Sequence, residues 1–396
     1  MKTTIKHTFI FIILLFTATV NAQKTTIDFI QNDIQSAVVE SKATKKNIFV
    51  MVYASWCVHC NKMKSTVLTD PAVITFFNDN FVNVMMDSET LQGKEFMKRF
   101  NIKSYPTYVF LDEKETHIYS SGGEFTSEAF IIEGQKALNP YNQLPFLEKQ
   151  FNQDRSNPDK CFAYLYTLKK SIDAEKSDEV TGQFLATQSK EQLFTPMNWK
   201  IVAYGVNDLN SKSFDLMVNH QADFAKVSSP KRVETKIVDV VKRTFATSMN
   251  SLDSINYSKT RIIAKNIKLS KVDSLVFRND LQMYEGIKNW KKYQETTLES
   301  VSKFAWSDYS ILNGITKNYN SYINETESLK TAISWAKRAV ELNNSAETIL
   351  LLARLHHKIG DKKAAIENAR NAKATIVAMG WSTKEIDAFY GELGIK

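Results

Sequence analysis

The segment IFVMVYASWCVHC, residues 48–60, decides the fold of this chain. Its first part, residues 48–53, is short, apolar and rich in β-branched and aromatic side chains, which is typical of a central strand covered on both faces. Apolar residues at helical spacing follow from Lys62 onward, so a strand runs into a helix at Cys57. Free N–H groups and the dipole at a helix N-terminus stabilise a thiolate, so Cys57 is the predicted nucleophile. Cys60, one turn further along, is placed to attack a mixed disulfide at Cys57.

The residues that follow alternate between helical and extended patterns. Pro106 precedes a short apolar stretch, and a turn after it leads to a hairpin partner. A Thr-Ser-Glu sequence then marks the N-terminus of a last helix. The expected elements are a helix ending at 81, strands at 82–87 and 108–111, a helix at 93–100, a hairpin strand at 116–120 and a helix at 126–138.

Two motifs together resemble those of a thioredoxin-fold domain. Trp56 directly precedes the Cys-x-x-Cys pair, and the sequence Tyr-Pro-Thr stands at 105–107, where an apolar strand begins. The resemblance covers residues 23–138. Within that superfamily the chain is most similar to the secreted thioredoxin-like proteins and to the reducing domain of the periplasmic electron transporter.

The resemblance implies both an architecture and a site. The architecture is an α/β thioredoxin fold, in which a central mixed sheet is flanked by helices. Cys57 and Cys60 would form the redox-active disulfide and carry the catalysis. A cis peptide bond between Tyr105 and Pro106 would face them, and X-Pro bonds are those for which the cis form costs little. Trp56 and Tyr105 would border the groove that receives a polypeptide.

Two other uses of the cysteine pair are open at this point. A zinc site needs four ligands, but the chain has no second Cys-x-x-Cys, and His59 cannot readily complete a tetrahedron from within the same loop. A purely structural disulfide would close a very small loop and constrain little. We expect redox chemistry with no metal and no cofactor. Cys161 lies in an apolar helical stretch and is expected to be a buried, inert thiol.

The sequence gives conflicting signals about the direction of electron flow. His59 lies between the cysteines, as in oxidising members of the superfamily, where it stabilises the Cys57 thiolate and the reduced form. The surrounding sequence resembles reducing members. Met51 stands where thioredoxins carry a buried aspartate, and Asn83 replaces its usual lysine neighbour, so no proton acceptor serves Cys60. The favoured interpretation is a thiol–disulfide oxidoreductase for protein disulfides, a reductase rather than an oxidase, supplied by an upstream membrane electron donor.

The N-terminus is predicted to be a secretory signal peptide, residues 1–22. Lys2 and Lys6 precede an apolar run at 9–16, which is shorter than the roughly 20 residues that span a bilayer. Small residues then lead to a cleavage site after Ala22. The mature chain is therefore expected to be exported, either periplasmic or secreted, into an oxidising compartment.

A second region follows the predicted α/β domain. Prolines cluster in residues 139–160, which predicts a linker. Residues 161–396 show helical patterning, and 331–339 match 364–372 at an offset of 33. This period resembles that of tetratricopeptide repeats, over about 300–378. Because stacked helix pairs commonly form a concave binding surface, the alternative function is a non-enzymatic protein-binding scaffold with a degenerate thioredoxin-like domain.

Composition bounds the remaining possibilities. The 396 residues are 43% hydrophobic and 24% charged, which excludes a disordered or low-complexity chain, and three cysteines exclude a disulfide scaffold. The formal net charge is +8, but residues 23–138 carry 12 basic and 14 acidic side chains, so the positive excess lies elsewhere. No nucleic-acid-binding motif accompanies it. We therefore expect protein partners, no nucleic acid and no more than peripheral contact with a membrane.

Overall fold

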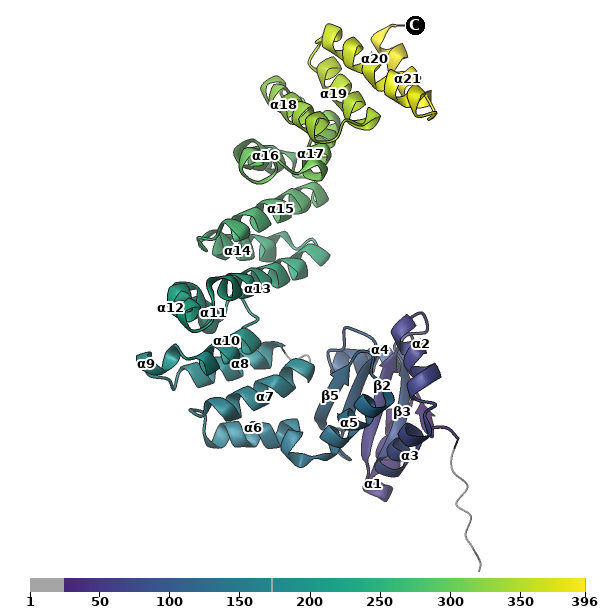
Figure 1. Cartoon of the computed structure of the whole chain (residues 1–396), viewed down its shortest axis with the longest axis vertical. Coiled ribbons are helices and arrows are strands. Elements are labelled where there is room, and N and C mark those ends of the chain that lie inside the picture. The colour runs from purple at the N-terminus through teal and green to yellow at the C-terminus, as the bar shows by residue number, and fades with distance from the viewer. Residues whose placement is uncertain (1–24, 172–173, 396) are drawn as a thin grey trace, which may run out of the picture. The chain divides into compact units, whose positions relative to one another are not determined.

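The structure of the chain is a computed structural model that describes residues 25–171 and 174–395 (Figure 1). The predicted signal peptide, residues 1–22, lies outside the described residues. The chain divides into two compact units, one up to Gln188 and one from Ser189 onward. The first unit holds an α/β domain and the helices that follow it, and the second is helical.

A five-stranded mixed sheet forms the centre of the first unit. Strand β2 (Asn47–Tyr53) pairs in parallel with β3 (Phe81–Asp87) and antiparallel with β4 (Thr107–Leu111). Strand β1 (Phe29–Gln31) extends the β3 edge and β5 (His117–Gly122) the β4 edge, which gives the order β1-β3-β2-β4-β5. All residues of β2 except the two at its ends are buried, as expected of a strand covered on both faces.

Helices cover both faces of this sheet, which is the predicted central mixed sheet flanked by helices. Phe49 of β2 packs on Phe77 with ring centroids 4.7 Å apart, and Phe77 stacks on Phe130 at the same distance. These rings join the sheet to two of the helices. One face carries α1 (Ile34–Thr44) and α4 (Leu91–Arg99); the other carries α2 (Val58–Lys62), its π-helical continuation η1 (Met63–Val67), α3 (Pro71–Asn80) and α5 (Ser127–Leu138).

The predicted elements of this domain are confirmed. The strand expected at 82–87 is β3, the hairpin strand is β5, and the helix expected at 93–100 is α4. Helix α5 begins after Thr126, whose side chain accepts a hydrogen bond from the backbone N–H of Ala129. No expectation covered β1, which has only three residues and no alternating pattern.

Residues 139–160, where the sequence predicts a linker, contain regular structure. Helix α6 lies within this segment and buries Phe151, because its apolar side chains lie on one face. Both α6 and α7 contact strand β5, and the first compact unit extends to Gln188. The elements after α5 in this unit are η2 (Pro140–Asn142), α6 (Leu144–Gln153), α7 (Pro158–Ser171) and α8 (Ala174–Leu185).

The second unit is built from helices that pack on their neighbours in the sequence, as α19 does on α18 and α20. The predicted helical character is confirmed. Its helices are α9 (Lys190–Leu193), α10 (Pro196–Gly205), α11 (Lys212–Asn219), α12 (Gln221–Val227), α13 (Pro230–Asn250), α14 (Ser254–Lys265), α15 (Ser270–Gly286), α16 (Trp290–Phe304), α17 (Tyr309–Tyr322), α18 (Thr326–Leu342), α19 (Ala346–Lys358), α20 (Lys362–Ala378) and α21 (Lys384–Leu393).

The two similar segments found in the sequence lie in α18 and α20, which are both 17 residues long. Ala336, Ala365 and Ala369 in these segments are fully buried, and their small side chains let the helices approach closely. The assignment to tetratricopeptide repeats stays a prediction. In the part of the chain that the structure describes, no helix has the length and apolar character needed to cross a membrane.

Candidate active site

The two cysteines lie where β2 gives way to α2. Cys57 is the N-cap residue of α2, with extended backbone angles, and its Sγ accepts a hydrogen bond from the Cys60 N–H at 3.2 Å. Both cysteines are buried, and they form a disulfide with Cα atoms 5.2 Å apart. The strand-to-helix junction predicted from the sequence therefore places Cys57 at the positive end of a helix.

An exposed apolar surface adjoins the disulfide. Trp56 is 68% exposed and Val58 is 76% exposed, so neither side chain is part of the core. The Trp56 ring meets the edge of the Tyr105 ring, with centroids 5.8 Å apart. The peptide bond between Tyr105 and Pro106 is cis. The structure thus brings together Trp56, the cysteine pair and Tyr105, which come from segments far apart in the sequence.

A carboxylate that sequence reasoning missed lies against α2. Glu124, in the loop between β5 and α5, accepts a hydrogen bond from His59 Nδ1 at 2.8 Å through Oε2 and contacts the Lys62 ammonium through Oε1. The hydrogen bonds from Lys62 and His59 hold the pKa of the Glu124 carboxyl below its ordinary value. No motif marks Glu124, because its partner His59 is 65 residues away in the sequence.

A second carboxylate fixes the loop before the cysteines. Glu89, between β3 and α4, accepts hydrogen bonds from the Ser55 backbone N–H at 3.2 Å and from the Ser55 hydroxyl at 2.5 Å. These bonds lower the pKa of the Glu89 carboxyl. The segment that carries Trp56 and Cys57 is therefore tied to the neighbouring loop.

The two positions that depart from the thioredoxin pattern are both in the core. Met51 of β2 is fully buried, and Asn83 of β3 is buried with its Nδ2 3.3 Å from the Phe77 carbonyl oxygen. Neither side chain can accept a proton at neutral pH. A proton released by Cys60 must therefore leave by a route that does not use these positions.

The third cysteine is remote from this chemistry. Cys161 is a free thiol, fully buried in α7, and burial raises its pKa far above the ordinary range of a thiol. A neutral buried thiol is a poor nucleophile, in keeping with the expected inert role. Within residues 25–171 and 174–395 there is no cluster of three or more His, Cys, Asp or Glu side chains suited to a metal ion.

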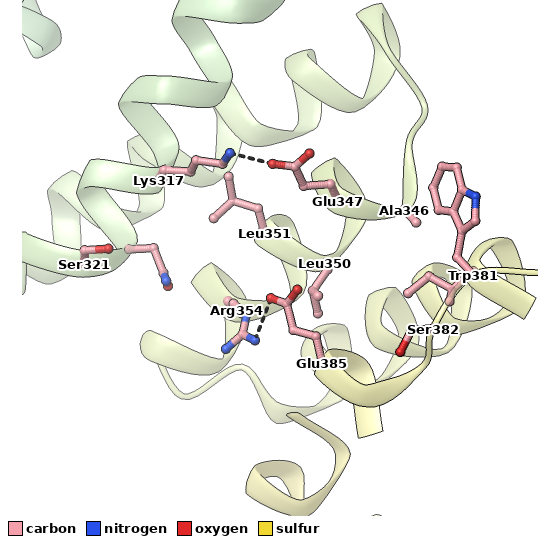
Figure 2. A pocket seen from close by; sticks show the side chains of 12 residues that line it. Lys317, Ser321, Ala346, Glu347, Leu350, Leu351, Arg354, Trp381, Ser382 and Glu385 are labelled. Atoms are coloured by element: carbon pink, nitrogen blue, oxygen red, sulfur yellow. Dashed lines mark hydrogen bonds and ion pairs between the residues drawn. The ribbon is translucent and has the colours of Figure 1, made fainter. Parts of the chain in front are cut away.

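The second unit contains a cavity of about 620 Å³ near its C-terminus (Figure 2). Leu350 and Leu351 of α19 contribute apolar surface, and Trp381, in the turn between α20 and α21, is 58% exposed at its edge. Two ion pairs also line it, Lys317 with Glu347 at 2.5 Å and Arg354 with Glu385 at 3.3 Å. A volume of this size suits a small ligand or a few side chains of a polypeptide.

The mixed sheet, the disulfide at the end of its central strand and the cis proline before β4 define a thioredoxin-fold domain with a Cys-x-x-Cys pair. Residues 29–113 match the family model described as thioredoxin-like, which confirms the resemblance seen in the sequence. The match covers the strands from β1 to β4 and the cysteine pair between them.

The relatives match about a quarter of the chain. The chain is 34% identical over 102 residues to the thiol:disulfide interchange protein DsbD of Actinobacillus pleuropneumoniae, a match that covers 25% of this chain and 16% of that protein. The DsbD protein of Pseudomonas fluorescens is 24% identical over 102 residues, with 25% and 18% covered. This chain thus spans less than a fifth of the length of these curated relatives.

Among solved structures, a putative disulphide-isomerase from Bacteroides thetaiotaomicron is 26% identical, with a TM-score of 0.28 over 30% of this chain and 98% of that chain. The oxidised C-terminal domain of DsbD from Neisseria meningitidis is 17% identical, with a TM-score of 0.24 over 26% of this chain and 90% of that chain.

Proposed function

We propose that this protein is a thiol–disulfide oxidoreductase that acts on protein disulfides. The observation that carries the proposal is the Cys57–Cys60 disulfide at the N-terminus of α2, beside the exposed ring of Trp56. A helix N-terminus stabilises the thiolate that thiol–disulfide exchange requires. A large exposed aromatic side chain next to it suits contact with a polypeptide.

In the reducing direction, the Cys57 thiolate attacks one sulfur of a substrate disulfide. A bond forms between Cys57 Sγ and that sulfur, and the other substrate sulfur leaves as a thiolate. The Cys60 thiolate then attacks Cys57 Sγ, which releases the second substrate sulfur and forms the Cys57–Cys60 disulfide. Two electrons pass from the protein to the substrate. The oxidising direction is the reverse sequence.

We assign the reducing direction as the main one, with an upstream membrane electron donor that reduces the Cys57–Cys60 disulfide after each cycle. The similarity of the domain to proteins named thiol:disulfide interchange protein supports thiol–disulfide exchange, and the resemblance of the sequence around the cysteines to reducing members favours this direction. Export through the signal peptide 1–22, with cleavage after Ala22, belongs to the same proposal, since such a donor would meet its partner outside the cytoplasm.

Trapping of the intermediate tests the proposal. In Cys60→Ser, the mixed disulfide between Cys57 and a substrate cannot be resolved, so we expect covalent complexes on a non-reducing gel that dithiothreitol dissolves. Cys57→Ser keeps the fold but lacks the nucleophile and is the matched control. Equal yields of complexes in the two variants, or none in either, would contradict the catalytic assignment.

A second candidate function is protein binding by the helical region, in which case the thioredoxin-like domain is degenerate and does no catalysis. The cavity lined by Leu350, Leu351 and Trp381 favours it, because apolar surface beside an exposed tryptophan is typical of interfaces (Figure 2). If Trp381→Ala abolishes the biological activity of the protein and Cys57→Ser leaves that activity unchanged, the binding function is favoured over the redox function. Met379→Ala, at an exposed side chain two residues away, is the control.

A further inference from the structure

We propose that Glu124 is a positioning residue that lowers the reduction potential of the Cys57–Cys60 pair, because it places a fixed negative charge beside the basic side chains His59 and Lys62 of α2. The inference rests on the proposed redox function and deepens it, since it names a group that biases the pair toward the reducing direction. Glu124 touches neither cysteine in the structure and acts through His59 and Lys62.

The backbone on each side of Glu124 is held in place, so the contact with α2 is built into the fold. The N–H of Gly123 donates to the Pro106 carbonyl oxygen at 3.0 Å, and the N–H of Phe125 donates to Met63 Sδ at 3.4 Å. Gly123 has a φ of +93°, a conformation that favours glycine. The carboxylate is thereby anchored between the cis-proline segment and the helix that carries the cysteines.

The charge of Glu124 opposes the effect of its two partners. A cationic His59 or Lys62 on α2 stabilises the Cys57 thiolate and so stabilises the reduced pair. A carboxylate 2.8 Å from His59 Nδ1 and in contact with Lys62 cancels part of that positive charge. The reduced form is then stabilised less, and the potential is more negative than a Cys-x-His-Cys sequence alone would suggest.

Loss of Glu124 removes a full negative charge from the contact with α2. Its two basic partners, His59 and Lys62, stay on the helix that carries the cysteines. The site therefore becomes more positive, which favours the Cys57 thiolate. The variant pair is expected to be more oxidising.

The test is the reduction potential of the full-length protein, measured by equilibration with glutathione mixtures and thiol alkylation. We expect Glu124→Gln to shift the equilibrium constant about threefold toward the reduced protein, which is about 14 mV for a two-electron couple at 29.6 mV per tenfold. Glu128→Gln removes the same charge from an exposed side chain in the first turn of α5 and is expected to leave the constant unchanged.

Combined variants show whether the charge acts through its two partners. The shift caused by Glu124→Gln should fall when it is introduced into a His59→Gln, Lys62→Met background. An unchanged potential in Glu124→Gln, a shift toward a more negative value, or an equal shift in Glu128→Gln would overturn the inference. A wild-type pair that never exchanges with glutathione would instead overturn the proposed function, so the two failures are distinguishable.

Discussion

The Cys57–Cys60 pair should be harder to reduce in the folded protein than in the unfolded chain. The disulfide joins residues three apart and closes a loop of four residues. Loop-closure entropy for four residues stabilises the folded oxidised protein by about 2 kcal/mol relative to the reduced one. Because folding and reduction are linked, the same free energy makes the potential of the folded pair more negative.

The helix N-terminus works in the opposite direction. In the reduced protein, the dipole of α2 stabilises the Cys57 thiolate by about 0.5–1 kcal/mol, since Cys57 is the N-cap residue. The loop term is the larger of the two. The difference between the two terms, about 1 kcal/mol, favours the folded oxidised protein. It makes the potential of the folded pair about 20 mV more negative than that of the unfolded pair, since about 30 mV corresponds to about 1.4 kcal/mol.

The assay compares two potentials of one protein. Glutathione mixtures are equilibrated with the chain in native buffer and in urea that unfolds it, and alkylation reports the fraction reduced. A Cys161→Ala variant removes the third thiol, so that each measurement concerns one pair. A folded potential less negative than the unfolded one would refute the reasoning. It would mean that thiolate stabilisation exceeds the loop term, as an oxidase requires.

Three further outcomes are expected. The hydrogen bonds from Lys62 and His59 lower the pKa of Glu124, so its carboxylate stays ionised somewhat below the ordinary value of 4.5. The difference in potential between wild type and Glu124→Gln should therefore vanish only as pH falls through this lowered pKa, and a difference that persists in stronger acid would contradict this. The Asp280 side chain is 3% exposed and accepts hydrogen bonds from Tyr257 and Arg261, each at 2.6 Å. Asp280→Ala should therefore lower the free energy of unfolding of the second unit by about 3 kcal/mol in a urea titration, and Asp280→Asn should lower it by less. In Gly134→Ala the new methyl group would lie 2.5 Å from a ring carbon of Phe76 on α3. The cost of overpacking, about 1–3 kcal/mol, should outweigh the gain in helix propensity of about 1 kcal/mol, so we expect a lower melting temperature. A higher melting temperature would contradict this.

The strands and helices of the first domain were predictable because their signals are local. The apolar run at 48–53 identified β2, and the Thr-Ser-Glu sequence identified the start of α5. The segment 139–160 shows the limit of such signals. Its prolines lie at the starts of helices, where the missing N–H costs nothing, so proline content alone did not reveal that α6 packs on β5.

The candidate site was predictable in its chemistry but only partly in its composition. Cys57, Cys60 and Pro106 follow from motifs, and the resemblance to thioredoxin-fold domains anticipated the cis bond. Residue type alone did not decide the exposure of Trp56, because an aromatic residue after an apolar strand suits either a core or a surface. Its expected place beside the groove came from the resemblance. Glu124 carries no sequence signal, since carboxylates occur throughout the chain.

The sequence by itself determined that a buried strand runs into a helix with a cysteine at its N-terminus, since periodicity and residue type act over a few neighbouring positions. Only the tertiary structure decided which charges surround that cysteine. Glu124 reaches His59 across 65 residues because strands β4 and β5 return the chain to the end of α2. Contacts of that range arise from sheet pairing and packing, and these decide how a cysteine pair common to many proteins is tuned here.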